Sequence, residues 1–267
     1  MGERMKKFLV LLSILCFGAY ADTINLHWLN EDGSTYQNST CTVDSDLNIP
    51  TTPPTKYGYT FTGWEIVNYT PIEYLESTGT QYIDTEYIPK IGTKFKIRVQ
   101  SLSSGTMDFA GLTSTRASNV QYSYFAPLVV QNNKCIYYFN SYHITNAECR
   151  NSDVITASIQ VMSTSAQIIQ NNETLNQINT YTQSGVFERT HSLYLFAGHK
   201  YSGGDSPSEI STAKIFYAKI WENDVLVRDF IPVLDEDGVP CMFDKVEGKF
   251  YYNQGTGQFI AGPVLTE

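Results

Sequence analysis

Charged side chains are scarce in this sequence and basic ones are the scarcer kind. Only 17% of the 267 residues are charged, and 18 Lys and Arg face 27 Asp and Glu, so the formal net charge is −9. No run of consecutive Lys or Arg concentrates positive charge locally. Such a chain repels phosphate backbones, which argues against nucleic acid as a partner.

The sequence also lacks a hydrophobic run of the roughly 20 residues that span a bilayer as a helix. Its main apolar run covers residues 8–17, follows Arg4, Lys6 and Lys7, and precedes Ala19-Tyr20-Ala21. Basic residues, a short apolar run and small residues at alternate positions are typical of a signal peptide. We therefore predict a signal peptide at 1–21, a mature chain without a membrane span, and a secreted, periplasmic or cell-surface location.

Catalytic patterns are missing as well. No G-x-S-x-G elbow occurs, and no E-x-D-x-x-E strand offers the paired carboxylates of jelly-roll glycosidases. The densest acidic cluster, Asp235-Glu236-Asp237-Gly238, ends in Asp-Gly, which favours a hairpin tip. His199 falls in a predicted loop, where we expect an exposed imidazole with no oriented partner. The sequence predicts no catalytic residue and no enzyme.

Cysteine and metal-ligand patterns are weak. Cys135 and Cys149 are close enough in sequence to form a disulfide in an exported chain, and buried free thiols are the alternative. The four His residues are scattered, which argues against zinc. Asp205 is a weak calcium candidate, but no Asp-rich loop accompanies it. We expect no cofactor, with calcium left open.

The abundant residues are strand formers. The chain has 19 Tyr and 14 Phe, and Phe95, Ile97 and Val99 alternate with Lys94, Lys96 and Arg98. Alternation of this kind predicts a strand with one buried face. Gly-rich and Asn-rich turn signals punctuate many such segments, so we predict an all-β sandwich or barrel.

The first part of the mature chain, residues 23–66, forms one compact unit. It has an alternating segment at 24–28, a Pro-rich stretch at 51–56, and a closing Gly58-Tyr59-Thr60-Phe61-Thr62-Gly63-Trp64. This pattern resembles the Listeria/Bacteroides repeat of internalin-type surface proteins, which implies a small β-grasp-like module. Trp64 then supplies buried area, and stacking on a sugar is the alternative role. Residues 67–71 form a short linker.

The second part, residues 72–263, carries several further motifs. They include Ile72–Thr85, Leu195–Lys200, Lys214–Trp221, Leu226–Pro232, Met242–Asp244 and Phe250–Phe259. Their order resembles bacterial laminin G-like, concanavalin A-like jelly rolls. The resemblance implies a β-sandwich that binds a ligand rather than one that catalyses a reaction.

We make one specific prediction for the end of this sandwich. Residues 239–252 form a hairpin that turns at Glu247-Gly248 and directs Phe243 and Phe250 into the core. A last strand at 258–261 then returns beside residues 72–76, as the last strands of jelly rolls commonly do.

Aromatic rows are the candidate ligand sites. Alternation places Tyr122 and Tyr124 on one face of a strand, and Tyr138 lies on a later strand. Tyrosine offers a stacking ring with a polar tip, which suits sugars, although these rings can instead fill the core. We predict a non-catalytic exported bacterial adhesion protein that recognises a glycan or a host or cell-surface protein. The alternatives are a structural envelope spacer and a glycan hydrolase without a recognisable motif.

Overall fold

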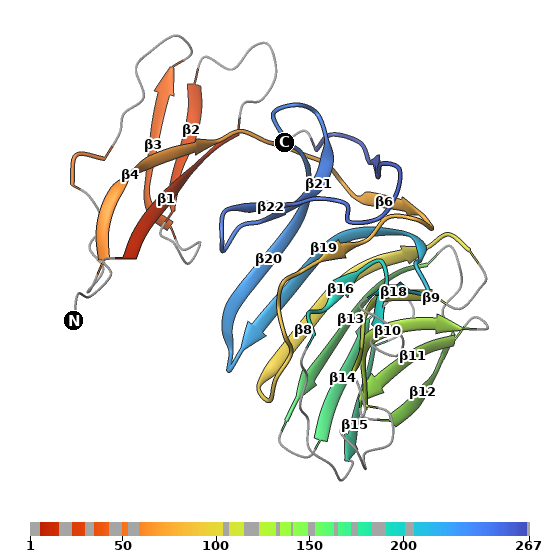
Figure 1. The fold of residues 1–267 in the computed structure, drawn as a ribbon. Helices are drawn as coiled ribbons and strands as arrows, with labels where there is room; N and C mark the ends of the chain where they lie inside the picture. The colour runs from red at the N-terminus through yellow and green to blue at the C-terminus, as the bar shows by residue number, and fades with distance from the viewer. Residues whose placement is uncertain are drawn as a thin grey trace.

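The computed structural model describes backbone and side chains for part of the chain, including most of the C-terminal half of the sandwich. For the remaining strands it describes the backbone alone. The fully described residues are 37, 50–52, 68–103, 153–162, 191–199 and 206–265. The described part is all-β and contains no helix. The architecture is a jelly-roll β-sandwich with a small separate sheet at its N-terminal side (Figure 1).

The N-terminal unit is a four-stranded sheet in the order β3-β2-β1-β4. Its strands are β1 (Lys6–Leu15), β2 (Thr23–Leu29), β3 (Thr35–Thr42) and β4 (Tyr59–Val67). The apolar run predicted to be part of a signal peptide supplies β1, which pairs antiparallel with β2 and parallel with β4. Removal of the signal peptide would therefore leave β2 and β4 without the strand between them.

The first sheet of the sandwich has the order β12-β11-β10-β9-β16-β7, and the β17–β18 pair joins it at β9. Its strands are β7 (Ile83–Asp84), β9 (Met107–Ser114), β10 (Ser123–Gln131), β11 (Lys134–Phe139), β12 (Ser141–Glu148), β16 (Tyr194–Leu195), β17 (Gly198–Lys200) and β18 (Ser206–Ser208).

The second sheet has the order β15-β14-β13-β8-β19-β20-β21-β22, with β6 beside β19, β23 beside β6 and β5 beside β20. Its strands are β5 (Thr70–Pro71), β6 (Leu75–Thr78), β8 (Thr93–Ser101), β13 (Val154–Val161), β14 (Ser165–Asn171), β15 (Asn176–Thr182), β19 (Thr212–Glu222), β20 (Val225–Leu234), β21 (Pro240–Asp244), β22 (Lys249–Tyr251) and β23 (Ile260–Ala261).

The core lies between the two sheets, as in other sandwiches. The predicted alternation in β8 is confirmed, because Phe95, Ile97 and Val99 are fully buried while the intervening basic residues are half-exposed or exposed. Further buried core residues come from β13, β16 and β19: Ile155, Ala157, Ile159, Leu195, Ala213, Ile215, Ala218 and Ile220. One face of the second sheet therefore faces the core, and at β8 and β19 the other face is exposed to solvent.

The C-terminal prediction is confirmed in its topology. β21 and β22 form the hairpin, and β23 pairs with β6 through Ile260 with Glu76 and Ala261 with Leu75. The predicted pairing of Phe243 with Phe250 across the hairpin is confirmed, and Phe243 is buried. The core that they enter is not the main one but a small cluster with Val233 and Cys241 on the opposite face of the hairpin.

The reason is the two-residue period of a strand, by which a shift of one residue exchanges the two faces. The neighbouring pair, Met242 and Tyr251, faces the main core instead. The linker covers the small cluster on the other face. Tyr69 lies 4.6 Å from Phe243 between ring centroids, and Pro71 pairs with Val233. The last residues of the predicted linker thus belong to the sandwich sheet.

The opening and closing motifs of the sandwich bind each other. The Gln254 N–H donates to the Tyr82 carbonyl at 2.8 Å, and the Thr256 N–H donates to the Thr80 carbonyl at 3.0 Å. A Cβ at Gly255 would lie 2.0 Å from the Thr80 carbonyl oxygen. This close approach of two backbones requires glycine, which explains the Gly within Asn253-Gln254-Gly255.

Candidate functional site

Most residues singled out from the sequence as ligand or metal candidates fall in segments given only by their backbone or not described. Tyr124 lies in β10 and Tyr138 in β11, where Tyr138 pairs with Ala126. Tyr122 and Asp205 lie outside the described residues. The tyrosine site and the calcium site therefore stay predictions.

The cysteine predictions have a similar outcome. Cys149 lies outside the described residues, and Cys135 is placed only by its backbone in β11, so their disulfide stays a prediction. Cys241 is described, and it is a buried free thiol. Burial raises the pKa of the Cys241 thiol to about 12, which keeps it protonated and unreactive at neutral pH.

His199 corrects a sequence prediction. Its side chain is buried, with 3% exposed, and its Nδ1 lies 2.8 Å from the Ser192 carbonyl oxygen. Its ring stacks on Tyr194 at 3.9 Å between centroids. The expectation of an exposed, unoriented imidazole was wrong because the segment is strand β17, paired with β9, rather than a loop. His199 therefore packs within the first sheet, where the Ser192 carbonyl and the Tyr194 ring fix the orientation of its imidazole.

The acidic cluster that begins at Asp235 forms the predicted turn. The Asp235 carboxylate accepts the N–H groups of Asp237 and Val239, and Gly238 has a φ of 77°. Among the described residues, no three His, Cys, Asp or Glu side chains are grouped so that they could hold a metal ion. The described residues also include no helix long and apolar enough to cross a membrane.

The candidate site is the solvent face of the second sheet, which we call the outer face. Lys94, Lys96 and Arg98 project from β8 on this side because their neighbours point into the core. β19 lies beside β8 and places Trp221 opposite Lys94 and Tyr217 opposite Arg98. A basic row and an aromatic row therefore run side by side on adjacent strands.

A β-bulge in β19 enlarges the aromatic row. Ala213 and Ile215 are buried before the bulge, and Ala218 and Ile220 are buried after it. The register with β8 shifts between Ile215 and Tyr217, and the two consecutive residues Phe216 and Tyr217 are both half-exposed. The extra residue changes the phase of the alternation and so adds a ring to the outer face.

The basic groups on the outer face lie over the rings. Lys94 Nζ is 5.2 Å from the centroid of Trp221, and Lys96 Nζ is 5.9 Å from that of Tyr217. Arg98 Cζ is 5.4 Å from the centroid of Phe216. Contacts of this kind contribute about 0.5–1 kcal/mol each at exposed sites. They hold the charged groups near the sheet surface instead of leaving them free to swing.

A second group of contacts borders this row at β6. Lys214 Nζ lies 4.0 Å from the centroid of Tyr74, and the Tyr74 and Phe216 rings meet edge to face at 5.7 Å. Lys214 also lies 3.8 Å from Glu76. On the other side of β19, Lys219 Nζ lies 3.0 Å from the Asp229 carboxylate. The acidic groups at both borders are thus neutralised by lysines of β19.

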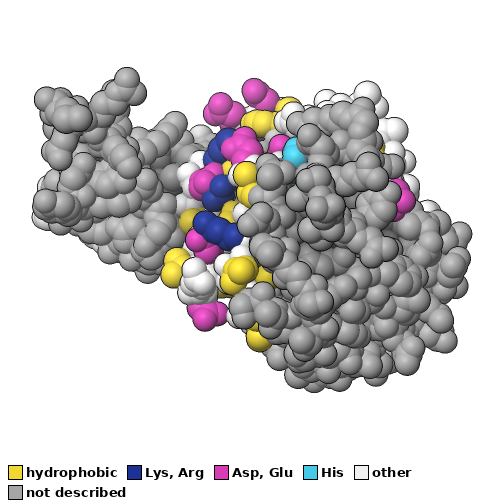
Figure 2. Space-filling view, turned by 60° about the horizontal axis from the view of Figure 1, so that its bottom comes forward, with side chains coloured by type: hydrophobic (Ala, Val, Ile, Leu, Met, Phe, Trp, Pro, Cys, Tyr) yellow, Lys and Arg dark blue, Asp and Glu magenta, His cyan; other side chains and the backbone are white. Residues whose placement is uncertain are grey.

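The central basic residues have no such partner. Within the fully described segments, Lys94, Lys96 and Arg98 form no ion pair. Figure 2 shows a strip of the surface on which Lys and Arg side chains lie beside Asp and Glu side chains. On the described strands β6, β8 and β19, the outer face therefore has an excess of positive charge in a chain whose net charge is −9.

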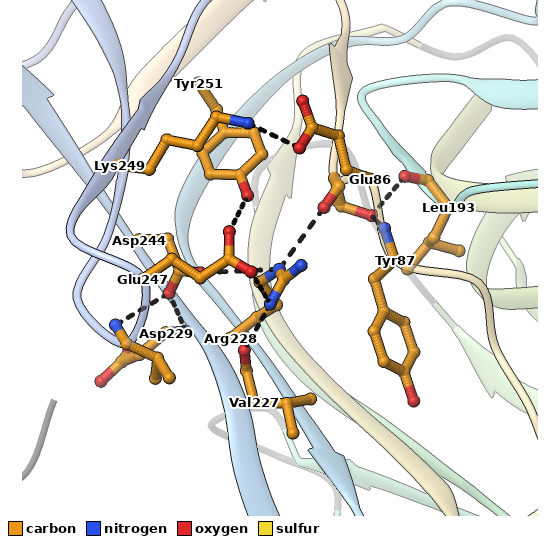
Figure 3. Close-up of polar contacts among 12 residues, drawn as sticks. Glu86, Tyr87, Leu193, Val227, Arg228, Asp229, Asp244, Glu247, Lys249 and Tyr251 are labelled. Carbon is orange, nitrogen blue, oxygen red and sulfur yellow. Dashed lines mark hydrogen bonds and ion pairs between the residues drawn. The ribbon is translucent and has the colours of Figure 1, made fainter. Parts of the chain in front are cut away.

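A second polar cluster surrounds Arg228 on β20 (Figure 3). Arg228 Nη1 lies 2.6 Å from Glu247 Oε1, and Arg228 Nε lies 3.5 Å from Asp244 Oδ2. The Tyr251 hydroxyl donates to Glu247 at 2.6 Å. Two backbone N–H groups, from Asp229 and Val246, donate to Asp244 Oδ1.

This cluster is structural rather than catalytic. Asp244 has no exposed surface, and burial raises the pKa of its carboxyl to about 6 against the opposing effect of the two N–H donors and Arg228. A carboxyl with no exposed surface does not reach a substrate. Its contacts tie β20 to β21 and to the hairpin turn, and so join the two motifs Leu226–Pro232 and Met242–Asp244.

The sequence contains a signal for the outer face in the basic residues of β8. All three solvent-facing positions at 94, 96 and 98 are basic in a chain where basic residues are scarce. Trp221 lies at a half-exposed position of β19, and no periodic rule identifies it because a bulge precedes it.

Comparisons with known proteins give only distant likenesses. No family model and no curated protein matches the chain. Solved structures that are similar include mouse laminin α1 domains LG4-5, at 11% identity and a TM-score of 0.41 over 59% of this chain and 45% of that one. A Bacteroides ovatus protein to which carbohydrate binding has been attributed has 6% identity and a TM-score of 0.47, over 92% of this chain and 70% of that one.

A third likeness is to the LG1-3 region of the laminin α2 chain, at 9% identity and a TM-score of 0.39 over 91% of this chain and 48% of that one. The chain thus spans about half the length of either laminin structure. None of these comparisons supports the internalin-type repeat predicted at residues 23–66. At such low identities and TM-scores, the fold rests on the strand pairings described above.

Proposed function

We propose that this protein is a non-catalytic, exported binding protein that recognises a glycan or a cell-surface protein through the outer face of its second sheet. The observation that carries the proposal is the half-exposed row of Phe216, Tyr217 and Trp221 beside the basic row of β8. Aromatic rings bury apolar ligand surface, and the Tyr hydroxyl and Trp N–H satisfy polar groups of the same ligand.

The shape of the site suits an extended ligand. A sheet face spreads its contacts over several neighbouring strands, here β6, β8 and β19, instead of concentrating them at one reactive atom. Catalysis needs acid, base or nucleophilic groups within reach of a substrate. The described carboxyl with a strongly raised pKa, that of Asp244, is buried, which supports binding rather than hydrolysis.

Export is part of the proposal and is supported by the signal-like sequence at 1–21. An exported protein meets glycans and surface proteins of its own or neighbouring cells. Calcium at Asp205 stays a separate prediction.

The test is a glycan array and a pull-down of cell-surface proteins with the exported form of the full chain. We expect at least one saturable ligand whose binding is lost in the Y217A/W221A double variant. The matched control is Y252A, which removes an exposed ring that does not belong to β6, β8 or β19. Absence of any ligand in both assays would contradict the proposal and favour a structural spacer.

A further inference from the structure

We infer that the ligand of the outer face is an acidic polysaccharide, with its carboxylate or sulfate groups bound along Lys94, Lys96 and Arg98. This inference rests on the proposed function and specifies the class of ligand for the same face. It goes beyond aromatic stacking because it assigns the binding energy and the selectivity to three named cations.

The acidic side chains that border the row are already paired with lysines of β19, and not with the cations of β8. The two acidic side chains that border the row, Glu76 and Asp229, already lie 3.8 Å from Lys214 and 3.0 Å from Lys219. These two ion pairs show that carboxylates are accommodated on the lysines of this surface. The three cations of β8 offer the same chemistry, and no acidic side chain among the described residues pairs with them, so an external anion is a suitable partner.

The basic side chains of β8 are held in position before a ligand arrives. Lys94 and Lys96 lie over the rings of Trp221 and Tyr217, which limits the rotamers that their long side chains sample before a ligand arrives. Arg98 is exposed and stacks on Phe216, so its guanidinium edge is free to bind a carboxylate or sulfate with two hydrogen bonds. Ordered cations lose less entropy when the anion binds.

Lys94, Lys96 and Arg98 form a regularly spaced row along β8. Alternate residues of one strand are about 7 Å apart, since each residue rises by about 3.4 Å. The acidic remainder of the chain repels nucleic acid. Acid groups that recur along a polysaccharide can each meet a successive cation of such a row. Such a polysaccharide also presents sugar faces to the rings of β19.

The experiment measures binding of the full exported chain to four polymers: polygalacturonate, dextran sulfate, neutral dextran and single-stranded DNA. The key variant is K94Q/K96Q, and its control is K90Q/K249Q. The control makes the same charge change at two lysines outside β8 that already form ion pairs, Lys90 with Glu222 and Lys249 with Glu86. Circular dichroism and thermal unfolding of both variants show that each is folded.

We expect binding to at least one of the two acidic polysaccharides, weaker at high salt, and none to neutral dextran. The K94Q/K96Q variant should bind that polymer about tenfold more weakly, while the control changes less than twofold. R98Q should weaken binding in the same direction. Comparison of polygalacturonate with dextran sulfate shows whether carboxylate or sulfate is preferred.

Three results would overturn the inference: equal binding to neutral dextran, an unchanged affinity in K94Q/K96Q, or a preference for single-stranded DNA. If the chain binds a neutral glycan or a surface protein in the array and pull-down, the proposed function survives without its acidic ligand. If it binds nothing in any assay, both the inference and the proposed function fail.

Discussion

Arg228 on β20 and Asp244 on β21 lie 3.5 Å apart, measured from Nε to Oδ2, and Asp244 is completely buried. A buried carboxylate is costly unless it is paired and accepts hydrogen bonds. Asp244 has both, because the N–H groups of Asp229 and Val246 donate to its Oδ1. This arrangement joins the central strands of the second sheet to the C-terminal hairpin and so supports the sheet that carries the outer face.

The first prediction concerns the pH dependence of stability at Asp244. Its pKa is about 6 in the folded protein against an ordinary 3.8, so the folded chain holds this proton over a pH range where the unfolded chain has released it. The resulting stability is complete below about pH 4 and is lost as the pH rises through 6. Urea unfolding should show that the stability of the wild type relative to D244N falls by about 2–3 kcal/mol between pH 4 and pH 7. A pH-independent difference, or one that rises with pH, would contradict the assignment.

The second prediction concerns Arg228, whose removal leaves Asp244 buried without its cation. R228A should lower the free energy of unfolding by about 3–5 kcal/mol at pH 7. The R228A/D244A double variant should lose less than the sum of the two single variants, because the uncompensated charge is gone. Denaturant unfolding of all four proteins measures this coupling. Additive losses would show that the two side chains act independently.

The third prediction concerns the contact between the opening and closing motifs. G255A places a Cβ against the Thr80 carbonyl, so we expect a loss of more than about 2 kcal/mol and weaker protection of the Thr256 amide in hydrogen exchange. The control is G238A, where a Cβ meets nothing within 4 Å but φ is positive, so about 1 kcal/mol is expected. Equal effects of the two substitutions would mean that the close approach at Gly255 does not matter.

The sandwich could be predicted from the sequence because its strands follow local rules. Alternation in β8 identified both the buried face and the exposed basic positions, and the turn at Asp235 followed from its Asp-Gly ending. The return of β23 beside β6 was also predicted. The placement of Phe243 and Phe250 was not, since the face of a short hairpin depends on a one-residue register that composition does not reveal.

The sequence predicted the type of side chain at the candidate site, aromatic rings, but not where in the fold the site lies. Aromatic rings for stacking were expected at Tyr122, Tyr124 and Tyr138, whose side chains lie outside the described residues. The outer face arises from pairing between β8 and β19, which are more than 100 residues apart in sequence. A bulge at Phe216 also breaks the alternation, so no periodic pattern could place Phe216 and Tyr217 on one surface with Arg98.

The fourth prediction concerns export and the N-terminal sheet. If residues 1–21 act as a signal peptide, the protein recovered from the periplasm or medium of a bacterial host begins at Asp22 by intact-mass measurement. That form lacks β1, which lies between β2 and β4. Hydrogen exchange should then show weaker protection of β2 than in the uncleaved chain. Recovery of an exported protein that still begins at Met1 would contradict the cleavage and leave β1 as a permanent strand.

The fifth prediction tests most directly whether the outer face binds the ligand, and it uses the fluorescence of Trp221. The chain has three tryptophans, at 28, 64 and 221, so the emission difference between the wild type and W221F reports on Trp221. Titration with the polysaccharide that binds best should change this difference saturably, with the same midpoint as calorimetry, because the ligand contacts the ring beside Lys94. Saturable binding by calorimetry with no change in the Trp221 signal, and an unchanged affinity in W221F, would place the ligand elsewhere and contradict the account.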